Sequence, residues 1–383
     1  MKMEVYLDNA ATTKIDNEVI NEIIKFNEKH YANPSSQYKI AKEVREKIEE
    51  AREKIAKYIN AESEEIIFTS GATESNNFAI KGLALAHPEK KHIITSCIEH
   101  PSIINTCKSL EKRGYEVDYI KVNEEGIIDI DEIKKRIRKD TLVVSIMWIN
   151  NEIGTIQPIK EIGEMCKEKG VYFHSDIVQG FKKIPLDVKE LNIDLLSVSG
   201  HKFNAPKGIG FLYIKLGTRI KRFMDGGEQE FKLRAGTENI LGIIGLSKAL
   251  ELNLEIEKVK ENRDYILERL KEIKGIKING STEKRIYNNI NVSFYGIEGE
   301  SLMLLLDKEN IYVSTGSACS SHNLEESHVL KAINVDELYI HGSIRISLDK
   351  NIDKEKIDYF IEKLKEHVTY LRRMSPFKIK DEE

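Results

Sequence analysis

A lysine that follows an apolar segment is the first residue of this chain that could do chemistry. Lys202 stands in the stretch IDLLSVSGHKFNAPKGIG, in which residues 193–198 predict a buried strand that ends in a polar loop. Ligands of open α/β sheets bind at the carboxyl ends of the strands, because loops and helix N-termini converge there. Desolvation at such a position makes a lysine amine reactive. A solvated lysine in a surface turn is the alternative, and it is the commoner one for an isolated lysine.

A turn of small residues that opens a helix is the second candidate. Ser70, Gly71, Ala72 and Thr73 follow the predicted strand 66–69, and a helix is expected from Glu74. Backbone N–H groups at a helix N-terminus, together with a threonine hydroxyl, suit a phosphate group. Ordinary helix capping by Thr73 explains the same residues. This stretch alone therefore leaves both interpretations open.

Polar side chains also follow three further predicted strands. Asp176 ends the strand 171–176, with Gln179 three residues later, and a buried carboxylate needs a cation or a proton donor. A protonated heterocycle nitrogen would serve, and capping of the next helix explains Asp176 equally well. His100, before Pro101, fits a site or a capping role. Asn151 lies in the turn after the strand 142–148, where its amide would face the same ligand or form part of a plain turn.

The elements that must position these residues alternate between strands and helices. We expect strands at 66–69, 92–95, 117–122, 142–148, 171–176 and 193–198, and helices at 41–59, from Glu74, from Pro101, at 131–138 and at 158–169. Such alternation predicts a parallel sheet with crossover helices. A long helix is expected from Ile240 to about Ile256. Residues 260–383 mix charged helices with short strands at 289–294, 311–314 and 343–348, which indicates a second α+β domain.

Composition excludes several classes of protein. The chain of 383 residues has 63 acidic and 59 basic residues, a net charge of −4, so its charge predicts neither a nucleic acid nor a membrane surface as partner. Four widely spaced cysteines predict no disulfide framework and no zinc or other metal site. No apolar stretch approaches the roughly 20 residues that span a bilayer. We expect a cytoplasmic protein that binds a small metabolite.

Together, the candidates follow the order in which pyridoxal phosphate is held by enzymes that use a lysine as its Schiff-base partner. The chain resembles the cysteine desulfurases of the class V aminotransferase family, within the fold-type I pyridoxal-phosphate enzymes. The matching stretches run from residue 6 to residue 347 and are YLDNAATT, NPSS, FTSGATESNN, EHPS, NNEIGTIQPI, HSDIVQ, SGHKFNAPKGIG, RAGTEN, STGSACSS and SIRISL.

This resemblance implies an α/β fold with two domains. The large pyridoxal-phosphate domain would cover residues 14–250 and contain a mainly parallel seven-stranded sheet flanked by helices. The small α+β domain would combine residues 1–13 with 251–383 and carry the catalytic cysteine loop.

The resemblance also implies a role for each candidate. Lys202 would hold the cofactor and move the substrate's Cα proton, with His100 stacked on the ring and also catalytic. Asp176 would pair with the pyridine nitrogen and Gln179 with the ring oxygen. Further cofactor contacts would come from Ala72, Thr73, Asn151, Ser199, His201 and, across the interface of a homodimer, Thr237. Substrate would be positioned by Asn33, Asn151 and Arg345, whose planar guanidinium suits a carboxylate.

Cys319 is the residue that separates desulfurases from other aminotransferases in this resemblance. Its neighbours Gly316, Ser317, Ala318, Ser320 and Ser321 are small, as expected of a mobile loop that delivers a thiolate. Cys97, Cys107 and Cys166 have apolar or helical surroundings and are interpreted as small buried residues.

We therefore expect L-cysteine to be converted to L-alanine, with its sulfur left on Cys319 as a persulfide. The sulfur would pass to an acceptor protein such as an iron–sulfur scaffold, or to thio-cofactor or tRNA biosynthesis. A selenocysteine lyase or a cysteine sulfinate desulfinase of the same family is the nearest alternative. A non-catalytic sulfur carrier or scaffold partner is the alternative of another class. The chain departs from the usual family pattern at Tyr38, Ile177, Val178, Ala205, Glu228, Phe231 and Lys232, the last standing where glycine is common.

Overall fold

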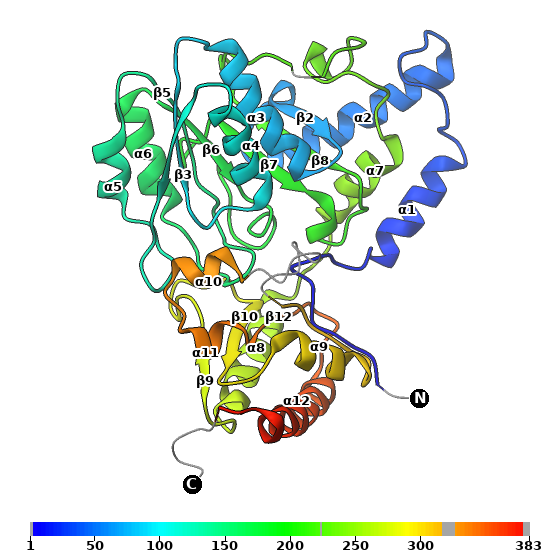
Figure 1. Cartoon of the computed structure of the whole chain (residues 1–383). Helices are drawn as coiled ribbons and strands as arrows, with labels where there is room; N and C mark the ends of the chain where they lie inside the picture. Colours follow the sequence, from blue (N-terminus) through cyan, green and yellow to red (C-terminus); the bar gives the residue numbers. More distant parts are fainter. Residues whose placement is uncertain (1–2, 223, 316–325, 378–383) are drawn as a thin grey trace.

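The computed structural model describes residues 3–222, 224–315 and 326–377. Figure 1 shows an upper body of blue to green elements and a smaller lower body of yellow to red ones. The N-terminal strand β1 (Val5–Tyr6) starts beside the lower body. Within the described ranges, no helix has both the length and the apolar character needed to cross a membrane.

The upper body is built on a seven-stranded sheet, which confirms the predicted fold class. Its strands lie in the order β2, β8, β7, β6, β5, β3, β4. All are parallel except β8, which runs antiparallel to β7 and to β2. The strands are β2 (Ile66–Thr69), β3 (His92–Ser96), β4 (Glu116–Ile120), β5 (Thr141–Ser145), β6 (Tyr172–Asp176), β7 (Leu195–Ser199) and β8 (Gly210–Ile214).

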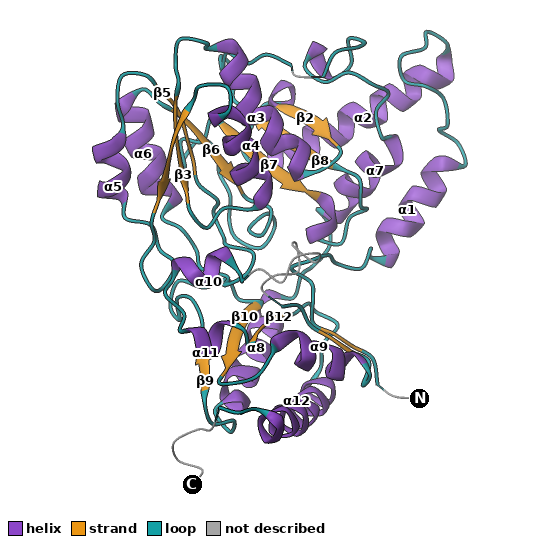
Figure 2. Cartoon of the chain, in the orientation of Figure 1, coloured by secondary structure: helices purple, strands orange, loops and turns teal. Residues whose placement is uncertain are grey.

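Helices cover both faces of the sheet (Figure 2). On one face, α1 (Asn17–Asn27), α2 (Lys39–Tyr58), α5 (Ile130–Arg136), α6 (Ile159–Lys169) and α7 (Ile240–Ala249) share a hydrophobic cluster with Ile66 and Phe68 of β2. On the other, α3 (Ala72–Ala86) and α4 (Pro101–Glu111) share a cluster with Ile67. Because successive strand residues point to opposite faces, strands covered on both sides carry apolar residues on both faces, as in β2, IIFT.

Strand β8 is the element of this sheet that the sequence pattern did not predict. It follows the turn after Lys202 and begins at Gly210. A side chain at this glycine would come within 2.8 Å of the Cα of Gly71. The absence of a Cβ therefore allows β8 to lie close to the start of α3. The turn that contains Lys202 leads directly into β8, so it lies near the same helix N-terminus.

Several predicted elements are shorter in the structure, among them the strand expected at 311–314, which ends at Tyr312. The helix predicted from Ile240 to about Ile256 ends at Ala249, and α8 (Ile256–Leu270) is a separate helix. The cause is Lys182, whose Nζ donates to the carbonyls of Ala249 and Leu252 at 2.6 and 2.5 Å and so satisfies the end of α7. The strand predicted at 142–148 ends at Ser145. Ile146 and Trp148 still donate to the β6 carbonyls of His174 and Asp176, but the N–H of Met147 turns to the carboxyl group of Glu99.

The lower body holds the C-terminal part of the chain together with β1. A three-stranded antiparallel sheet, in the order β12, β10, β9, and a parallel pair of β1 with β11 provide its strands. One hydrophobic cluster combines Val5 and Leu7 with residues from Val259 to Val368. The elements are α8, β9 (Ile276–Ile278), β10 (Asn289–Phe294), α9 (Gly299–Asp307), β11 (Ile311–Tyr312), α10 (His328–Ala332), α11 (Glu337–Ile340), β12 (Ser343–Ser347) and α12 (Lys354–Met374). The exact domain boundaries stay a prediction.

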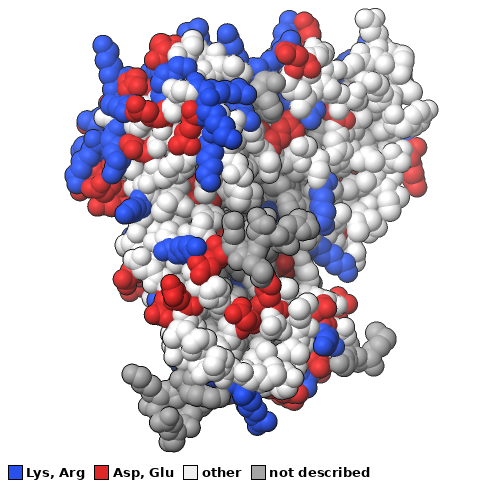
Figure 3. All heavy atoms as spheres, in the orientation of Figure 1, with Lys and Arg blue, Asp and Glu red and all other residues white. Residues whose placement is uncertain are grey.

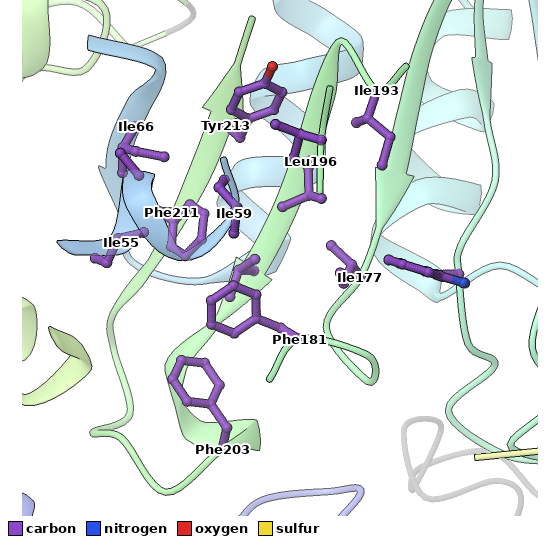
Figure 4. Close-up of a cluster of buried hydrophobic side chains, with 14 of the residues drawn as sticks. Ile55, Ile59, Ile66, Ile177, Phe181, Ile193, Leu196, Phe203, Phe211 and Tyr213 are labelled. Carbon is purple, nitrogen blue, oxygen red and sulfur yellow. The ribbon is translucent and has the colours of Figure 1, made fainter. Parts of the chain in front are cut away.

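The residues that directly follow Asp176 and Lys202 are anchored in the core. Ile177 and Phe203 are at most 1% exposed, and Figure 4 shows both side chains in the cluster around Phe181. The ring centroids of Phe181 and Phe203 lie 4.9 Å apart. This packing fixes the backbone on which the two polar side chains stand.

Candidate active site

Polar residues gather where the strands of the large sheet end. Asp176 is the last residue of β6, Ser199 the last residue of β7, and Lys202 ends the short helix η2 (Gly200–Lys202) that follows. His100 is the N-cap of α4, after β3, and lies close enough to Asp176 and Lys202 to feel both charges. The structure thus brings together predicted site residues from three separate strand ends.

Lys202 is held by the N-terminal segment 8–13. Its Nζ donates to the carbonyl oxygens of Ala10 and Ala11, at 2.8 and 2.7 Å. The side chain of Gln179 also donates to the Ala10 oxygen, at 2.9 Å. These carbonyls therefore hold the amine and the amide beside each other. Residue types do not predict this role, because any residue supplies a carbonyl.

Asp176 is nearly buried, and each of its carboxylate oxygens has a donor. Oδ1 accepts the N–H of Val178 at 3.0 Å, and Oδ2 accepts from the side chain of Asn76 at 2.8 Å. These two hydrogen bonds offset the cost of burying the carboxyl group. The carboxylate is suited to hold a proton on a neighbouring nitrogen.

His100 is arranged to remain neutral. Its Nδ1 lies 2.8 Å from Ser102 Oγ and accepts the N–H of Ser102 at 3.2 Å. Burial lowers the pKa of the imidazole, Asp176 raises it, and the charge of Lys202 lowers it. An uncharged ring can lie flat against an aromatic heterocycle without carrying a buried charge.

The N-terminus of α3 is open toward the end of β7. Its N-cap, Gly71, has φ +147°, and a side chain there would come within 3.3 Å of Ser199 Oγ. The first helical residues, Ala72 and Thr73, are not buried. This cradle of N–H groups and a hydroxyl fits an anion such as a phosphate.

His201 adds a further side chain on the same loop. Its Nδ1 lies 3.1 Å from Thr12 Oγ1. Burial, with the charges of Lys202 and Lys207, lowers the pKa of His201 to about 4. A neutral imidazole contributes hydrogen bonds at physiological pH and no formal charge.

Arg345, on β12, extends the site to the lower body. Its Nη2 pairs with Asp8 at 2.7 Å and its Nη1 donates to the backbone oxygen of Asn151 at 3.0 Å. The buried Nε has no hydrogen-bond partner among the described residues. The guanidinium is therefore oriented by both bodies and still has an N–H group for an incoming carboxylate.

Two predicted site residues lie away from Lys202, Asp176 and His100, and a third lies outside the described residues. Asn33 is exposed in the loop between α1 and α2, where its side chain accepts from the N–H of Ser35 at 2.9 Å. Thr237 is exposed after Gly236 and has no recorded contact with the residues above. Cys319 lies outside the described residues.

Sequence reasoning missed several buried polar residues behind the site. The carboxyl groups of Glu99 and Glu152 are fully buried, and burial raises the pKa of Glu99 to about 8 and that of Glu152 to about 7. Burial lowers the pKa of Lys183, whose Nζ lies 3.4 Å from Gln179 Oε1, to about 7. Glu99 and Glu152 stand beside His100 and Asn151 in the sequence, and this adjacency was the available signal.

Comparison with known proteins assigns the chain to a family. Residues 5–360 match the family described as Aminotransferase class-V. The chain belongs to that family. A curated relative from Dictyoglomus turgidum, named cysteine desulfurase IscS, is 52% identical, with 99% of this chain and 98% of the relative covered.

Solved structures show the same likeness. A structure titled NifS-like protein has a TM-score of 0.91 and 39% identity, and the match covers 96% of this chain and 100% of that one. A structure titled SspA in complex with cysteine has a TM-score of 0.82 and 36% identity, with coverage of 91% and 99%. The resemblance read from the sequence is therefore confirmed.

Proposed function

We propose that this member of the class V aminotransferase family is a pyridoxal-phosphate-dependent cysteine desulfurase that converts L-cysteine to L-alanine and leaves the sulfur on Cys319 as a persulfide. One observation carries the proposal. Lys202, Asp176 and His100 meet beside the open N-terminus of α3, in a chain that is 52% identical to a relative named as a cysteine desulfurase.

The residues present fit pyridoxal phosphate. The cradle at Gly71, Ala72, Thr73 and Ser199 suits its phosphate, and a side chain at Gly71 would fill that space. Asp176 would hold the proton of the ring nitrogen, His100 would lie on the ring, and Gln179 would contact the ring oxygen. When bound, the cofactor would withdraw the electron pair that forms at the substrate's Cα.

The chain's own residues would bind the substrate and move its proton. Arg345 would take the substrate carboxylate in place of, or beside, Asp8, since it already has an unpartnered N–H group. Lys202 would leave the carbonyls of Ala10 and Ala11, hold the cofactor covalently, and after displacement accept the Cα proton as a neutral amine.

Sulfur transfer would require a thiolate. The Cys319 thiolate would attack the substrate sulfur, so that an S–S bond forms while the substrate's Cβ–S bond breaks. The electron pair of the broken bond remains with carbon, and Cβ and Cα each gain a proton to give alanine. Sulfane sulfur remains on Cys319 and no external oxidant is needed.

The other cysteines are poorly suited to this step. Burial raises the pKa of Cys97, raises that of Cys107 to about 12, and raises that of Cys166. Each is therefore a thiol near neutral pH and a poor nucleophile. Cys107 and Cys166 are buried as predicted, but the prediction was wrong for Cys97, which is partly exposed. All three are free, which supports a reducing, cytoplasmic location.

A homodimer is part of the proposal, with Thr237 of each subunit reaching the phosphate of the other. The surface around α1 and the start of α2 exposes Ile20, Ile24, Tyr31 and Tyr38. Figure 3 shows few charged side chains at the upper right of the molecule, on the side of these elements. Apolar surface of this kind supports an interface between two copies. An acceptor protein, such as an iron–sulfur scaffold, would take the sulfur.

Replacing Lys202 by alanine tests the assignment of the active site. The Lys202→Ala protein should fold, because the amine is not part of the core, but it should lose turnover and the visible absorbance of covalently held cofactor. The matched control is Lys207→Ala, at an exposed position of the same loop. Unchanged absorbance in the Lys202 variant would show that the assignment is wrong.

A substrate panel separates the desulfurase from its relatives. Alanine release from L-cysteine, L-selenocysteine and cysteine sulfinate is measured side by side with the purified enzyme. We expect cysteine to be used, with the persulfide formed on the protein. Turnover of selenocysteine or of the sulfinate without any turnover of cysteine would favour a lyase or a desulfinase, and a colourless, inactive protein would favour a carrier role.

A further inference from the structure

Asn76 connects the two groups that would hold the cofactor ring. It lies on α3 and is fully buried. Its Nδ2 donates to Asp176 Oδ2 and to Ser102 Oγ, both at 2.8 Å. Because both acceptors face the nitrogen, turning the amide would place its oxygen against a carboxylate oxygen, so its orientation is fixed.

This orientation has a cost. The Oδ1 of Asn76 is buried and has no hydrogen-bond partner in the described ranges. A buried acceptor without a partner loses the hydrogen bonds that water would give it, and this destabilises the folded state. An apolar side chain would fill this position without an unpaired oxygen. The contribution of Asn76 is therefore its two donated hydrogen bonds.

The contacts of Ser102 extend this connection to His100. Since Nδ1 of His100 accepts the backbone N–H of Ser102, Nδ1 carries no proton. The Ser102 hydroxyl, 2.8 Å from Nδ1, must then donate to it, and its oxygen is left to accept from Asn76. A directed series of hydrogen bonds therefore runs from Asn76 through Ser102 to His100, and the ring proton lies on Nε2.

We propose that Asn76 is a positioning residue that holds the carboxylate of Asp176 toward the cofactor nitrogen and, through Ser102, holds His100 neutral with its proton on Nε2. The catalytic use of this arrangement rests on the proposed function. The coupling itself is a property of the protein and is measurable without substrate.

Loss of Asn76 should raise the pKa of His100. The charged groups that face the imidazole are Asp176, which favours its protonation, and Lys202 and His328, which oppose it. Without Asn76 the Ser102 hydroxyl is no longer oriented to donate to Nδ1, so the neutral imidazole loses one of its two hydrogen bonds at Nδ1, and the Asp176 charge is less well compensated. Both effects favour the protonated imidazole.

The experiment is an NMR titration of the full-length protein labelled with ¹⁵N-histidine, with and without bound cofactor. The His100 signals are identified with His100→Gln. In the unsubstituted protein the nitrogen shifts should show a protonated Nε2 and an unprotonated Nδ1. In Asn76→Leu the pKa of His100 should rise by about one unit, the equivalent of one ordinary hydrogen bond.

A neighbouring residue supplies the control. Asn77 is on the same helix, but its side chain contacts the carbonyl of Thr73 and the amine of Lys81. Asn77→Leu should leave the His100 titration unchanged. Circular dichroism and thermal unfolding establish that each variant is folded.

Ser102→Ala provides a second variant that does not depend on the folding of Asn76→Leu. It should raise the pKa of His100 by a similar amount, and it should reduce the further effect of Asn76→Leu in the double variant. An unchanged His100 titration in either folded single variant would overturn the proposal. That result is independent of whether the unsubstituted enzyme releases alanine from cysteine, so the two proposals fail separately.

Discussion

Cys319→Ser should separate the early steps of the proposed reaction, which need Lys202 and Asp176, from sulfur transfer, which needs the thiolate. The serine hydroxyl is similar in size but is not ionised at neutral pH, and its oxygen forms no stable persulfide. Lys202 and Asp176 remain, so added cysteine should change the spectrum of the bound cofactor without catalytic release of alanine. Absorbance and alanine are measured in the same sample.

Mass spectrometry of the unsubstituted enzyme completes this prediction. After cysteine is added, and before any reductant, the peptide with Cys319 should carry one extra sulfur. The raised pKa values of Cys97, Cys107 and Cys166 predict no extra sulfur on their peptides. Full turnover by the serine variant, or sulfur on another cysteine, would contradict the proposed role of the thiolate.

Some site residues could be predicted singly and others could not. Lys202 and Asp176 stand at the ends of apolar strands, where a charged side chain is conspicuous in the sequence. Asn76 lies within a helix, and its role depends on Ser102 and Asp176, which are 26 and 100 residues away. Local patterns contain no information about which distant acceptors a buried amide will meet.

At the scale of elements, the segment Glu230–Lys232 is strained. Its three residues have φ values of 47°, 55° and 67°, in the left-handed region that disfavours side chains. Lys232→Gly should relieve part of this cost and stabilise the protein by about 0.5–1 kcal/mol, a rise in Tm of roughly 1–2 °C. The lost ion pair with Glu228 is highly exposed and contributes little.

A lysine-to-glycine substitution within a helix should instead destabilise the protein. Lys167 lies inside α6, where glycine costs about 1 kcal/mol. Thermal unfolding of Lys232→Gly and Lys167→Gly under one set of conditions compares them directly. A lower Tm for Lys232→Gly would show that the loop needs its lysine.

Elements were predictable where local pattern and tertiary packing agree. The stripe of Val44, Ile48 and Ile55 predicted α2, and its residues are buried as expected. The end of α7 was not predictable, because it is set by Lys182 from a distant loop. Strand β8 was not predicted because it begins at Gly210, and a glycine after a proline-containing loop normally indicates a turn. In the structure this glycine allows close packing against α3.

At the scale of the whole molecule, burial of Glu99 predicts a pH-dependent stability. Its folded pKa is raised to about 8, above the unfolded value, so the folded state binds the extra proton between about pH 4.5 and pH 8. Stability associated with this group is therefore lost as the pH rises through that range. The glutamine of Glu99→Gln does not titrate. The free energy of unfolding of this variant, minus that of the unsubstituted protein, should therefore increase by about 3 kcal/mol when the pH is raised from 5 to 8.

Denaturant unfolding at the two pH values measures this difference. Glu132→Gln, at a partly exposed position of α5, is the matched control. A constant difference between Glu99→Gln and the unsubstituted protein across this range would show that Glu99 does not gain a proton on folding.

Subunit mixing tests whether Thr237 acts across a dimer. Lys202→Ala lacks the amine, and Thr237→Glu places a negative charge where a phosphate would bind; each should be inactive alone. In a mixed dimer one site combines an intact Lys202 with an intact Thr237 from the other chain. Unfolding and refolding the mixture should restore about a quarter of full activity. A mixture that forms mixed dimers and stays inactive would place Thr237 in its own chain's site or outside it.

The segment 8–13 determines when the site becomes complete during synthesis. Ala10 and Ala11 support Lys202, but the segment is itself held by Ser347, which accepts from Asn9, 338 residues earlier, at 2.9 Å. At typical translation rates these partners are made roughly 20–70 s apart. A chain that has not yet been synthesised as far as Ser347 therefore lacks a finished site, and its chemistry begins only after that residue has emerged from the ribosome.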